Sequence, residues 1–123
     1  MILLSMSCNR NRTEEFVTNI RSADELFRQG KDEEAMNALV KAEKCYNEDI
    51  PSAELGFLKM RKGDIYYRYY DYDRAIDSYN EGCEIFLTSG DTLNYCNALL
   101  LLCDASILNL DASRAHKCIS IMQ

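Results

Sequence analysis

Residues 63–86, GDIYYRYYDYDRAIDSYNEGCEIF, decide the fold of this chain. They predict two helices joined by a tight corner, because apolar and aromatic residues recur at spacings of three and four on both sides of Asp71. The small residues Gly63 and Ala75 stand where the two helices would cross, and aromatic side chains would fill the gaps between them. The stretch therefore predicts a close-packed antiparallel helix pair.

The composition limits the kind of protein. A chain of 123 residues is long enough for one domain with a buried core. Its 47% hydrophobic and 28% charged residues, with one proline, exclude disordered and collagen-like chains and favour long helices. A formal charge of −6 without a basic patch argues against nucleic acid and against an anionic membrane surface. No apolar run approaches the roughly 20 residues that span a bilayer, so we expect no transmembrane segment.

The cysteine pattern does not predict a metal site. The six cysteines form no CxxC pair, and His116 is the only histidine; the cysteines are Cys8, Cys45, Cys83, Cys96, Cys103 and Cys118. Five of them lie in helical patterns, where we expect small buried apolar side chains. There is also no glycine-rich phosphate loop and no nucleophile motif around His116. We therefore expect no metal, no cofactor and no catalytic activity.

Residues 1–10 differ from the rest of the chain. The apolar run MILLSMSC ends in Cys8 and is followed by polar residues, which resembles the end of a bacterial lipoprotein signal. The run is short, no charged segment precedes Ile2, and Ser5 stands where that signal prefers leucine. Two interpretations are open: a clipped signal in which Cys8 takes the lipid, or a ragged terminus. The first anchors the protein in the bacterial envelope, and the second is compatible with the cytoplasm.

Helix signals begin at Thr13, a good N-cap followed by two glutamates. Gly30 suits a helix exit, Pro51 suits the first turn of a helix, and Asp71 and Asp91 suit caps. These signals predict six helices, at about 13–29, 32–46, 51–69, 71–88, 91–108 and 111–123. We find no strand-like alternation.

A 40-residue period runs through the helical part of the chain. It aligns the alanines Ala35, Ala75 and Ala115, the small residues Ala23, Gly63 and Cys103, and three apolar columns, Phe27/Tyr67/Ile107, Leu39/Tyr79/Ile119 and Ile20/Met60/Leu100. Fixed periods of this length indicate stacked repeats. The units would cover about 13–50, 51–90 and 91–123.

These units resemble the tetratricopeptide repeat. Gly63, Tyr66 three residues later, and the YDRAI…Y run of residues 72–79 stand where that family has them. The resemblance implies an all-α, right-handed solenoid of about three helical hairpins over residues 13–123, with a role in holding other proteins. Lys59 and Lys62 depart from it, because the family has bulky apolar residues there. The register of the helix around them is therefore less well defined.

In such a solenoid, the first helix of each hairpin lines a concave groove. The predicted groove residues are Arg21, Asp24, Phe27, Arg28, Arg61, Asp64, Tyr67, Arg68 and Asp104. Its aspartates recur at the repeat period, and arginines flank two of them at spacings of three and four. One interpretation is a polar ladder lining a peptide groove. The other is a solvated, self-paired helix face, in which each ion pair contributes a few tenths of a kcal/mol.

The resemblance also bears on the partner. The family's carboxylate clamp has asparagine in the column of these aspartates, so we do not expect a receptor for chaperone tails. Aspartates in a chain of charge −6 favour a basic or mixed-charge segment. Five tyrosines between residues 66 and 72 cannot all face inward on one helix. They would either contact a partner or fill the core and the corner.

The sequence thus predicts a protein-interaction scaffold, and the long repeats behind a lipoprotein-like start resemble sensory or envelope proteins of Bacteroidetes-type bacteria. The alternative is a structural spacer or dimerisation arm with no groove activity. Ile119, Ile121 and Met122 keep the last predicted helix apolar. Either further repeats or another domain cover that helix in a longer protein, or its apolar face self-associates.

Overall fold

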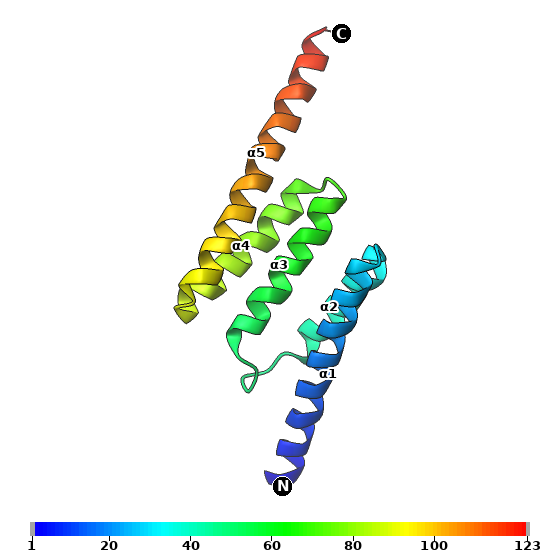
Figure 1. Ribbon diagram of the computed structural model, residues 1–123, viewed down its shortest axis with the longest axis vertical. Coiled ribbons are helices and arrows are strands. Elements are labelled where there is room, and N and C mark those ends of the chain that lie inside the picture. The colour runs from blue at the N-terminus through cyan, green and yellow to red at the C-terminus, as the bar shows by residue number, and fades with distance from the viewer. Residues whose placement is uncertain (1, 123) are drawn as a thin grey trace.

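The computed structural model describes residues 2–122, without the side chains of residues 2–9, 115, 118 and 122. The described chain is all-α, as predicted, and has no strand. Its helices are α1 (Ile2–Arg28), α2 (Asp32–Cys45), α3 (Ser52–Arg68), α4 (Tyr72–Ser89) and α5 (Thr92–Met122). α1 with α2 and α3 with α4 form two hairpins, and α5 packs on α4, so that the two termini lie at opposite ends of the molecule (Figure 1).

Both hairpins close with the same corner. Gly30 has φ 76° and Tyr70 has φ 62°, so a left-handed residue follows the first helix of each pair, at positions 40 residues apart. The amide of the next residue then bonds back to the helix it leaves: Lys31 donates to the Leu26 carbonyl at 2.9 Å, and Asp71 to the Tyr66 carbonyl at 3.0 Å. This is the usual way in which a left-handed residue satisfies the last carbonyls of a helix.

The third unit does not form a hairpin, and the prediction of six helices is wrong. α5 continues through residues 109–111, where the sixth helix was expected to begin. The position that corresponds to Gly30 and Tyr70 is Leu110. A leucine is costly in the left-handed region but is a good helix former, so the helical backbone is favoured there.

The first helix also differs from its prediction, because α1 begins at Ile2 and not near Thr13. Residues 2–12 contain several good helix formers and neither proline nor glycine, so nothing stops the helix in that segment. No helix boundary therefore separates residues 2–10 from the first predicted repeat, because α1 runs through residues 2–28. The side chain of Cys8 lies outside the described residues, and its lipidation stays a prediction.

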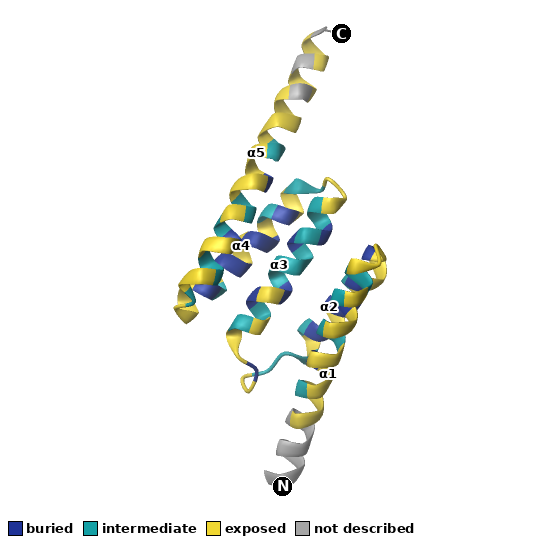
Figure 2. Cartoon of the chain, viewed as in Figure 1, coloured by how far each residue is buried: buried dark blue, intermediate teal, exposed yellow. Residues whose placement is uncertain are grey.

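Glycines set the distance between α3 and α4. A Cβ atom on Gly63 would lie 2.5 Å from Cε1 of Tyr79, and one on Gly56 would lie 2.7 Å from the Phe86 ring. Ala75 is fully buried beside them. Small residues thus occur at the helix crossing with aromatic rings packed against them, as the sequence predicts. The buried positions follow the facing sides of the two helices (Figure 2).

The two hairpins share part of their core. Leu58 and Ile65 of α3 are buried in the cluster that contains Phe16 of α1 and Leu39 of α2. α3 therefore packs on the first hairpin as well as on α4.

The two lysines that depart from the repeat pattern lie in polar contacts between helices. Lys59 forms ion pairs with Glu43 of α2 and with Glu81 of α4, the latter at 2.7 Å, and Lys62 pairs with Glu43 at 3.2 Å. Burial opposes the charge on Lys59, but hydrogen bonds to both glutamates outweigh it and raise its pKa. Burial likewise opposes the charge on Glu43, and the two lysines still hold its pKa below the usual value. Charged groups here join three helices.

α5 also bears on the membrane prediction. Residues 92–121 are long and apolar enough to cross a membrane by length and composition alone, and this is the one such helix in the described part of the chain. That test does not separate a membrane span from a helix that packs on protein. The absence of a transmembrane segment stays a prediction.

Candidate partner-binding groove

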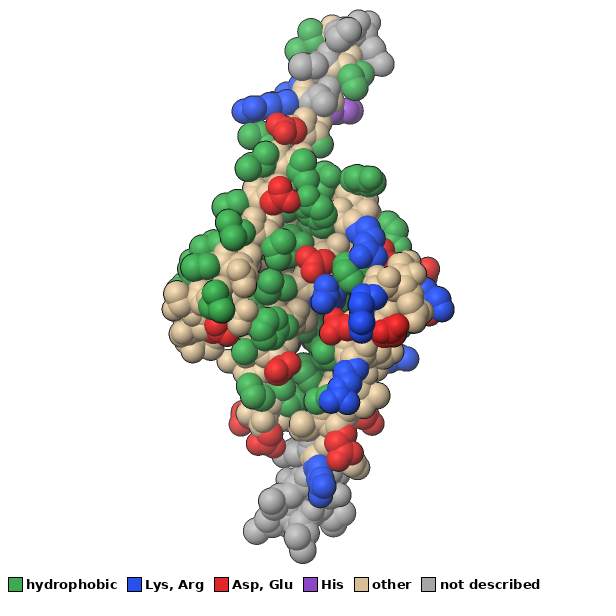
Figure 3. Space-filling model, in the orientation of Figure 1, with side chains coloured by type: hydrophobic (Ala, Val, Ile, Leu, Met, Phe, Trp, Pro, Cys, Tyr) green, Lys and Arg blue, Asp and Glu red, His purple; other side chains and the backbone are tan. Residues whose placement is uncertain are grey.

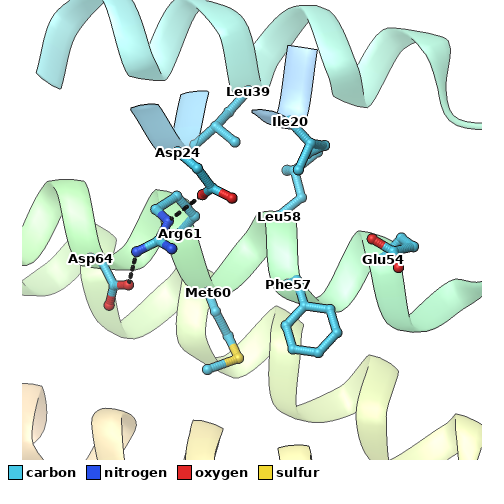
Figure 4. A pocket seen from close by; sticks show the side chains of 9 residues that line it. All are labelled: Ile20, Asp24, Leu39, Glu54, Phe57, Leu58, Met60, Arg61 and Asp64. Atoms are coloured by element: carbon cyan, nitrogen blue, oxygen red, sulfur yellow. Dashed lines mark hydrogen bonds and ion pairs between the residues drawn. The ribbon is translucent and has the colours of Figure 1, made fainter. Parts of the chain in front are cut away.

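An open hollow of about 540 Å³ lies between α1, α3, α4 and α5 and is called the groove below. It is lined by Phe27, Asp64, Tyr67, Arg68, Tyr70, Tyr79, Leu101 and Asp104. Five of these eight residues are predicted groove residues: Phe27, Asp64, Tyr67, Arg68 and Asp104. An adjoining hollow of about 390 Å³ is lined in part by two more, Asp24 and Arg61, and shares Asp64 (Figure 4). The structure thus gathers residues from the three predicted repeat units on one side of the molecule.

Arg61 connects the aspartates of two units. Its Nε donates to Oδ1 of Asp24 at 3.0 Å, and its Nη1 to Oδ2 of Asp64 at 3.3 Å (Figure 4). Of the two predicted pairs within α3, the one between Arg61 and Asp64 is present, whereas Arg68 pairs with Asp32 of α2. The predicted pairs of Asp24 with Arg21 and Arg28 are absent: Arg28 pairs with Glu25 at 2.9 Å, while Arg21 lines a separate hollow beside Asp49.

This difference has a simple physical cause. Arg21 and Arg28 are exposed on α1, where an ion pair within one helix contributes little. The Arg61 side chain is half-buried between two helices and lies 4.7 Å from the centre of the Phe27 ring. A cation placed over an aromatic face and between two carboxylates is better held than one in solvent.

Arg68 forms a second link between the hairpins. Its guanidinium lies 3.7 Å from the centre of the Phe27 ring, donates to the Phe27 carbonyl at 3.1 Å, and pairs with Asp32 at 2.5 Å. Asp32 is buried, although its sequence context indicates only an acidic helix start. No local pattern distinguishes it from Glu33 and Glu34, so this contact could not be found from the sequence.

Tyrosines donate hydrogen bonds to two aspartates of the column, Asp64 and Asp104. Tyr79 Oη donates to Oδ1 of Asp64 at 2.6 Å, and Tyr67 Oη donates to Oδ2 of Asp104 at 2.7 Å. Burial raises the pKa of Asp64 by more than the Tyr79 hydrogen bond and the nearby arginines lower it. The hydrogen bond to Asp104 raises the pKa of Tyr67 to about 12. Asp64 is thus half-buried, whereas Asp104 is exposed at the edge of the groove.

Some tyrosines of residues 66–72 fill the core, and others are exposed and could contact a partner. Tyr66 and Tyr67 pack against the buried residues Ala75 and Tyr79. Tyr69 and Tyr70 are exposed, and Tyr70 is the more exposed of the two, at 79%. The Tyr70 ring also lines the groove. One exposed tyrosine is therefore placed to touch a ligand in the groove.

The cysteines are less buried than predicted. Cys83 is buried and Cys45 half-buried, but Cys96 and Cys103 are exposed on α5. They are exposed because none of the other described helices packs on that side of α5. Within the described residues no three or more His, Cys, Asp or Glu side chains form a group that could hold a metal ion.

The chain was also compared with known proteins. No family model matches it, and neither the curated proteins nor the solved structures contain a significant match. The resemblance to the tetratricopeptide repeat therefore stays a prediction from the residues.

Proposed function

We propose that this chain is a tetratricopeptide-like scaffold, a right-handed solenoid that binds an extended segment of a partner protein in the groove. The observation that carries the proposal is the groove itself, because side chains from four helices and three repeat units converge on it. The two corners 40 residues apart, each with a left-handed residue, support the repeat interpretation. Binding requires no catalytic group, and we propose none.

The charges around the groove favour a basic or mixed-charge segment. Arg61 and Arg68 are already paired with aspartates and stacked on Phe27. Asp104 is exposed, and its one described hydrogen bond comes from Tyr67. A lysine or arginine of the partner would meet this carboxylate, with the Tyr70 ring as a face for stacking.

Charge reversal at Asp104 tests this proposal. We would titrate the full chain into fluorescein-labelled octapeptides rich in lysine and arginine, or rich in glutamate, and follow fluorescence anisotropy. We expect the basic peptide to bind more tightly than the acidic one, and Asp104→Lys to weaken it at least about tenfold, roughly 1.4 kcal/mol. Asp64→Lys is a poorer choice, because Asp64 accepts hydrogen bonds inside the fold.

Glu84→Lys is the matched control. Glu84 is exposed on α4 and does not line the groove, so this variant makes the same charge change elsewhere. We expect it to keep most of the affinity. Equal losses in the two variants would indicate a non-specific charge effect, and equal affinity for acidic and basic peptides would contradict the proposal.

A second candidate function, a spacer or dimerisation arm, is favoured by a different observation. α5 exposes several large apolar side chains that no described residue covers. This role does not require the groove, and the two functions can coexist.

A further inference from the structure

One side of α5 exposes a continuous line of apolar side chains, called the α5 seam below. Its members are Leu93, Cys96, Leu100, Cys103, Ile107 and Leu110, and all six are exposed. Leu93 and Leu100 are 73% and 70% exposed. The spacing alternates between three and four residues, as in the a and d positions of a coiled coil. Figure 3 shows apolar side chains along α5, while charged side chains gather over the first hairpin.

The α5 seam is not the side that attaches α5 to the rest of the protein. Ala98 and Ala105, which are fully buried, pack on the opposite side of the helix, in the clusters that contain Phe86 and Tyr79 of α4. An α-helix with one face already packed and a second apolar face in solvent needs a further partner, since large exposed apolar patches mark interaction sites.

The repeat period explains why this side is apolar. Cys96 and Cys103 of the α5 seam correspond to Gly56 and Gly63 in the second unit. Those glycines face α4, the second helix of their own hairpin. The α5 seam is therefore the surface that a second helix covers in the preceding unit, and the continuation of α5 past Leu110 leaves it open.

We propose that α5 of a second copy of this chain covers the α5 seam, in antiparallel orientation. In that orientation a positions face d positions: Leu93 lies opposite Leu110 of the second copy, Cys96 opposite Ile107, and Leu100 opposite Cys103. The pairing is the same when read from either chain. A two-fold symmetric interface requires this self-complementarity.

Charges beyond the seam select the antiparallel orientation. The same spacing continues to Arg114 and Lys117. In a parallel pair each would face its own copy across the interface, and like charges would be buried together. In the antiparallel pair they extend past Leu93 of the second copy. There they lie near Asp91 and the C-terminal end of α4, where a helix end favours cations.

This inference concerns the second candidate function and does not depend on peptide binding in the groove. Sedimentation velocity on the full chain tests it. We expect a dimer, and we expect Leu100→Glu at the centre of the seam to give a monomer with unchanged helical circular dichroism. Two controls introduce a glutamate at an apolar position off the seam: Val40→Glu on α2 and Ile119→Glu on α5 itself, whose side chains are 37% and 55% exposed. Both should stay dimeric.

Disulfide trapping tests the orientation. In Ile107→Cys, mild oxidation with oxidised glutathione should link the new thiol to Cys96 of the second copy and give a covalent dimer. The wild-type chain should cross-link much less, because the antiparallel register places no two native thiols opposite each other. Efficient wild-type cross-linking through Cys96 or Cys103 would indicate a parallel pair and overturn the proposed orientation.

Three further outcomes would overturn the proposal itself. The first is a wild-type monomer whose Cys96 and Cys103 react quickly with a maleimide, which would mean that the seam is uncovered. The second is a monomer in which both thiols are protected, which would mean that residues 111–122 fold back over the seam. The third is co-sedimentation with phosphatidylcholine vesicles that Leu100→Glu abolishes, which would indicate a lipid partner.

Discussion

The second and third predicted repeat units share a pattern of residue sizes at the 40-residue period but reach different structures. In the second unit, α3 and α4 pack as a hairpin with glycines at the crossing. In the third, the equivalent residues form the single helix α5. The alignment by 40 residues places Cys96 and Cys103 where Gly56 and Gly63 stand, and Ile119 where Tyr79 stands. A second helix packed on α5 could not approach as closely as α4 approaches α3, and it would lack the aromatic ring that fills the crossing.

The comparison teaches that periodicity and hairpin closure have separate causes. Residues of matched size at a fixed period are enough to give helices that begin at equivalent positions. Closure needs a residue that tolerates the corner and side chains small enough for two backbones to approach. Three pairs of substitutions test this difference between the two units.

Filling the crossing should have the largest effect. Gly63→Val would place a Cβ atom 2.5 Å from Cε1 of Tyr79, whose hydroxyl is held by its hydrogen bond to Asp64. We expect the free energy of unfolding, measured by urea denaturation, to fall by roughly 3 kcal/mol. Cys103→Val, the same change in the third unit, should alter it by less than about 0.5 kcal/mol in the Leu100→Glu background, in which the α5 seam is uncovered and Cys103 is exposed. Similar losses in both variants would mean that the glycine is not what closes the hairpin.

Removing the hydroxyl group of Tyr79 should have an intermediate effect. The equivalent residue of the third unit, Ile119, has no hydroxyl group. Tyr79→Phe removes the 2.6 Å hydrogen bond to the half-buried Asp64 carboxylate, which keeps its bond from Arg61, and we expect a loss of about 1 kcal/mol at pH 7. Tyr67→Phe, which removes the hydrogen bond to the exposed Asp104, should cost less than about 0.5 kcal/mol.

The loss in Tyr79→Phe should also depend on pH. The pKa of Asp64 is raised in the folded protein, so folding favours its protonated form. Its contribution to stability is therefore most favourable below the ordinary value of 3.8 and declines as the pH rises through the raised pKa. Without the tyrosine the pKa rises further. The difference between wild type and Tyr79→Phe should shrink as the pH is lowered from 7, and a constant difference would contradict this account.

Substitutions at the corner should have effects no larger than that of Tyr79→Phe, with opposite signs in the two units. Tyr70→Gly removes a tyrosine from the left-handed region and should raise the free energy of unfolding by roughly 1 kcal/mol. Leu110→Gly puts glycine inside α5, costs roughly 1 kcal/mol locally, and should speed amide hydrogen exchange in residues 108–114. If both variants destabilise, the left-handed corner is not strained by Tyr70.

The sequence predicted the parts of this structure that depend on local chemistry. The corners at Gly30 and Asp71, the buried Ala75 and the ion pair between Arg61 and Asp64 all follow from residue type and spacing. The continuation of α5 could have been suspected from Leu110 alone. Asp111 follows Leu110 and is a good N-cap, so the sequence predicted a corner there. The helix propensity of Leu110 outweighed this cap signal.

The contacts between units were beyond the reach of the sequence. Asp24 pairs with Arg61 at a separation of 37 residues, and the partner of Arg68 is the buried Asp32. Which of several nearby acids an arginine meets depends on the angle between the hairpins. A period can place residues in columns, but it does not fix that angle.

The contact between the two hairpins combines two kinds of interaction. Leu58 and Ile65 of α3 are buried against the first hairpin, and around them lie the ion pairs of Lys62 and Arg61 with acids of that hairpin. Dissolved ions weaken the second kind and leave the first nearly unchanged. The two hairpins should therefore move more freely relative to each other as the ionic strength rises, while their apolar contact holds them together. Because the contact between the hairpins sets the separation of α1 and α3, salt would make the shape of the groove more variable at concentrations that do not unfold either hairpin.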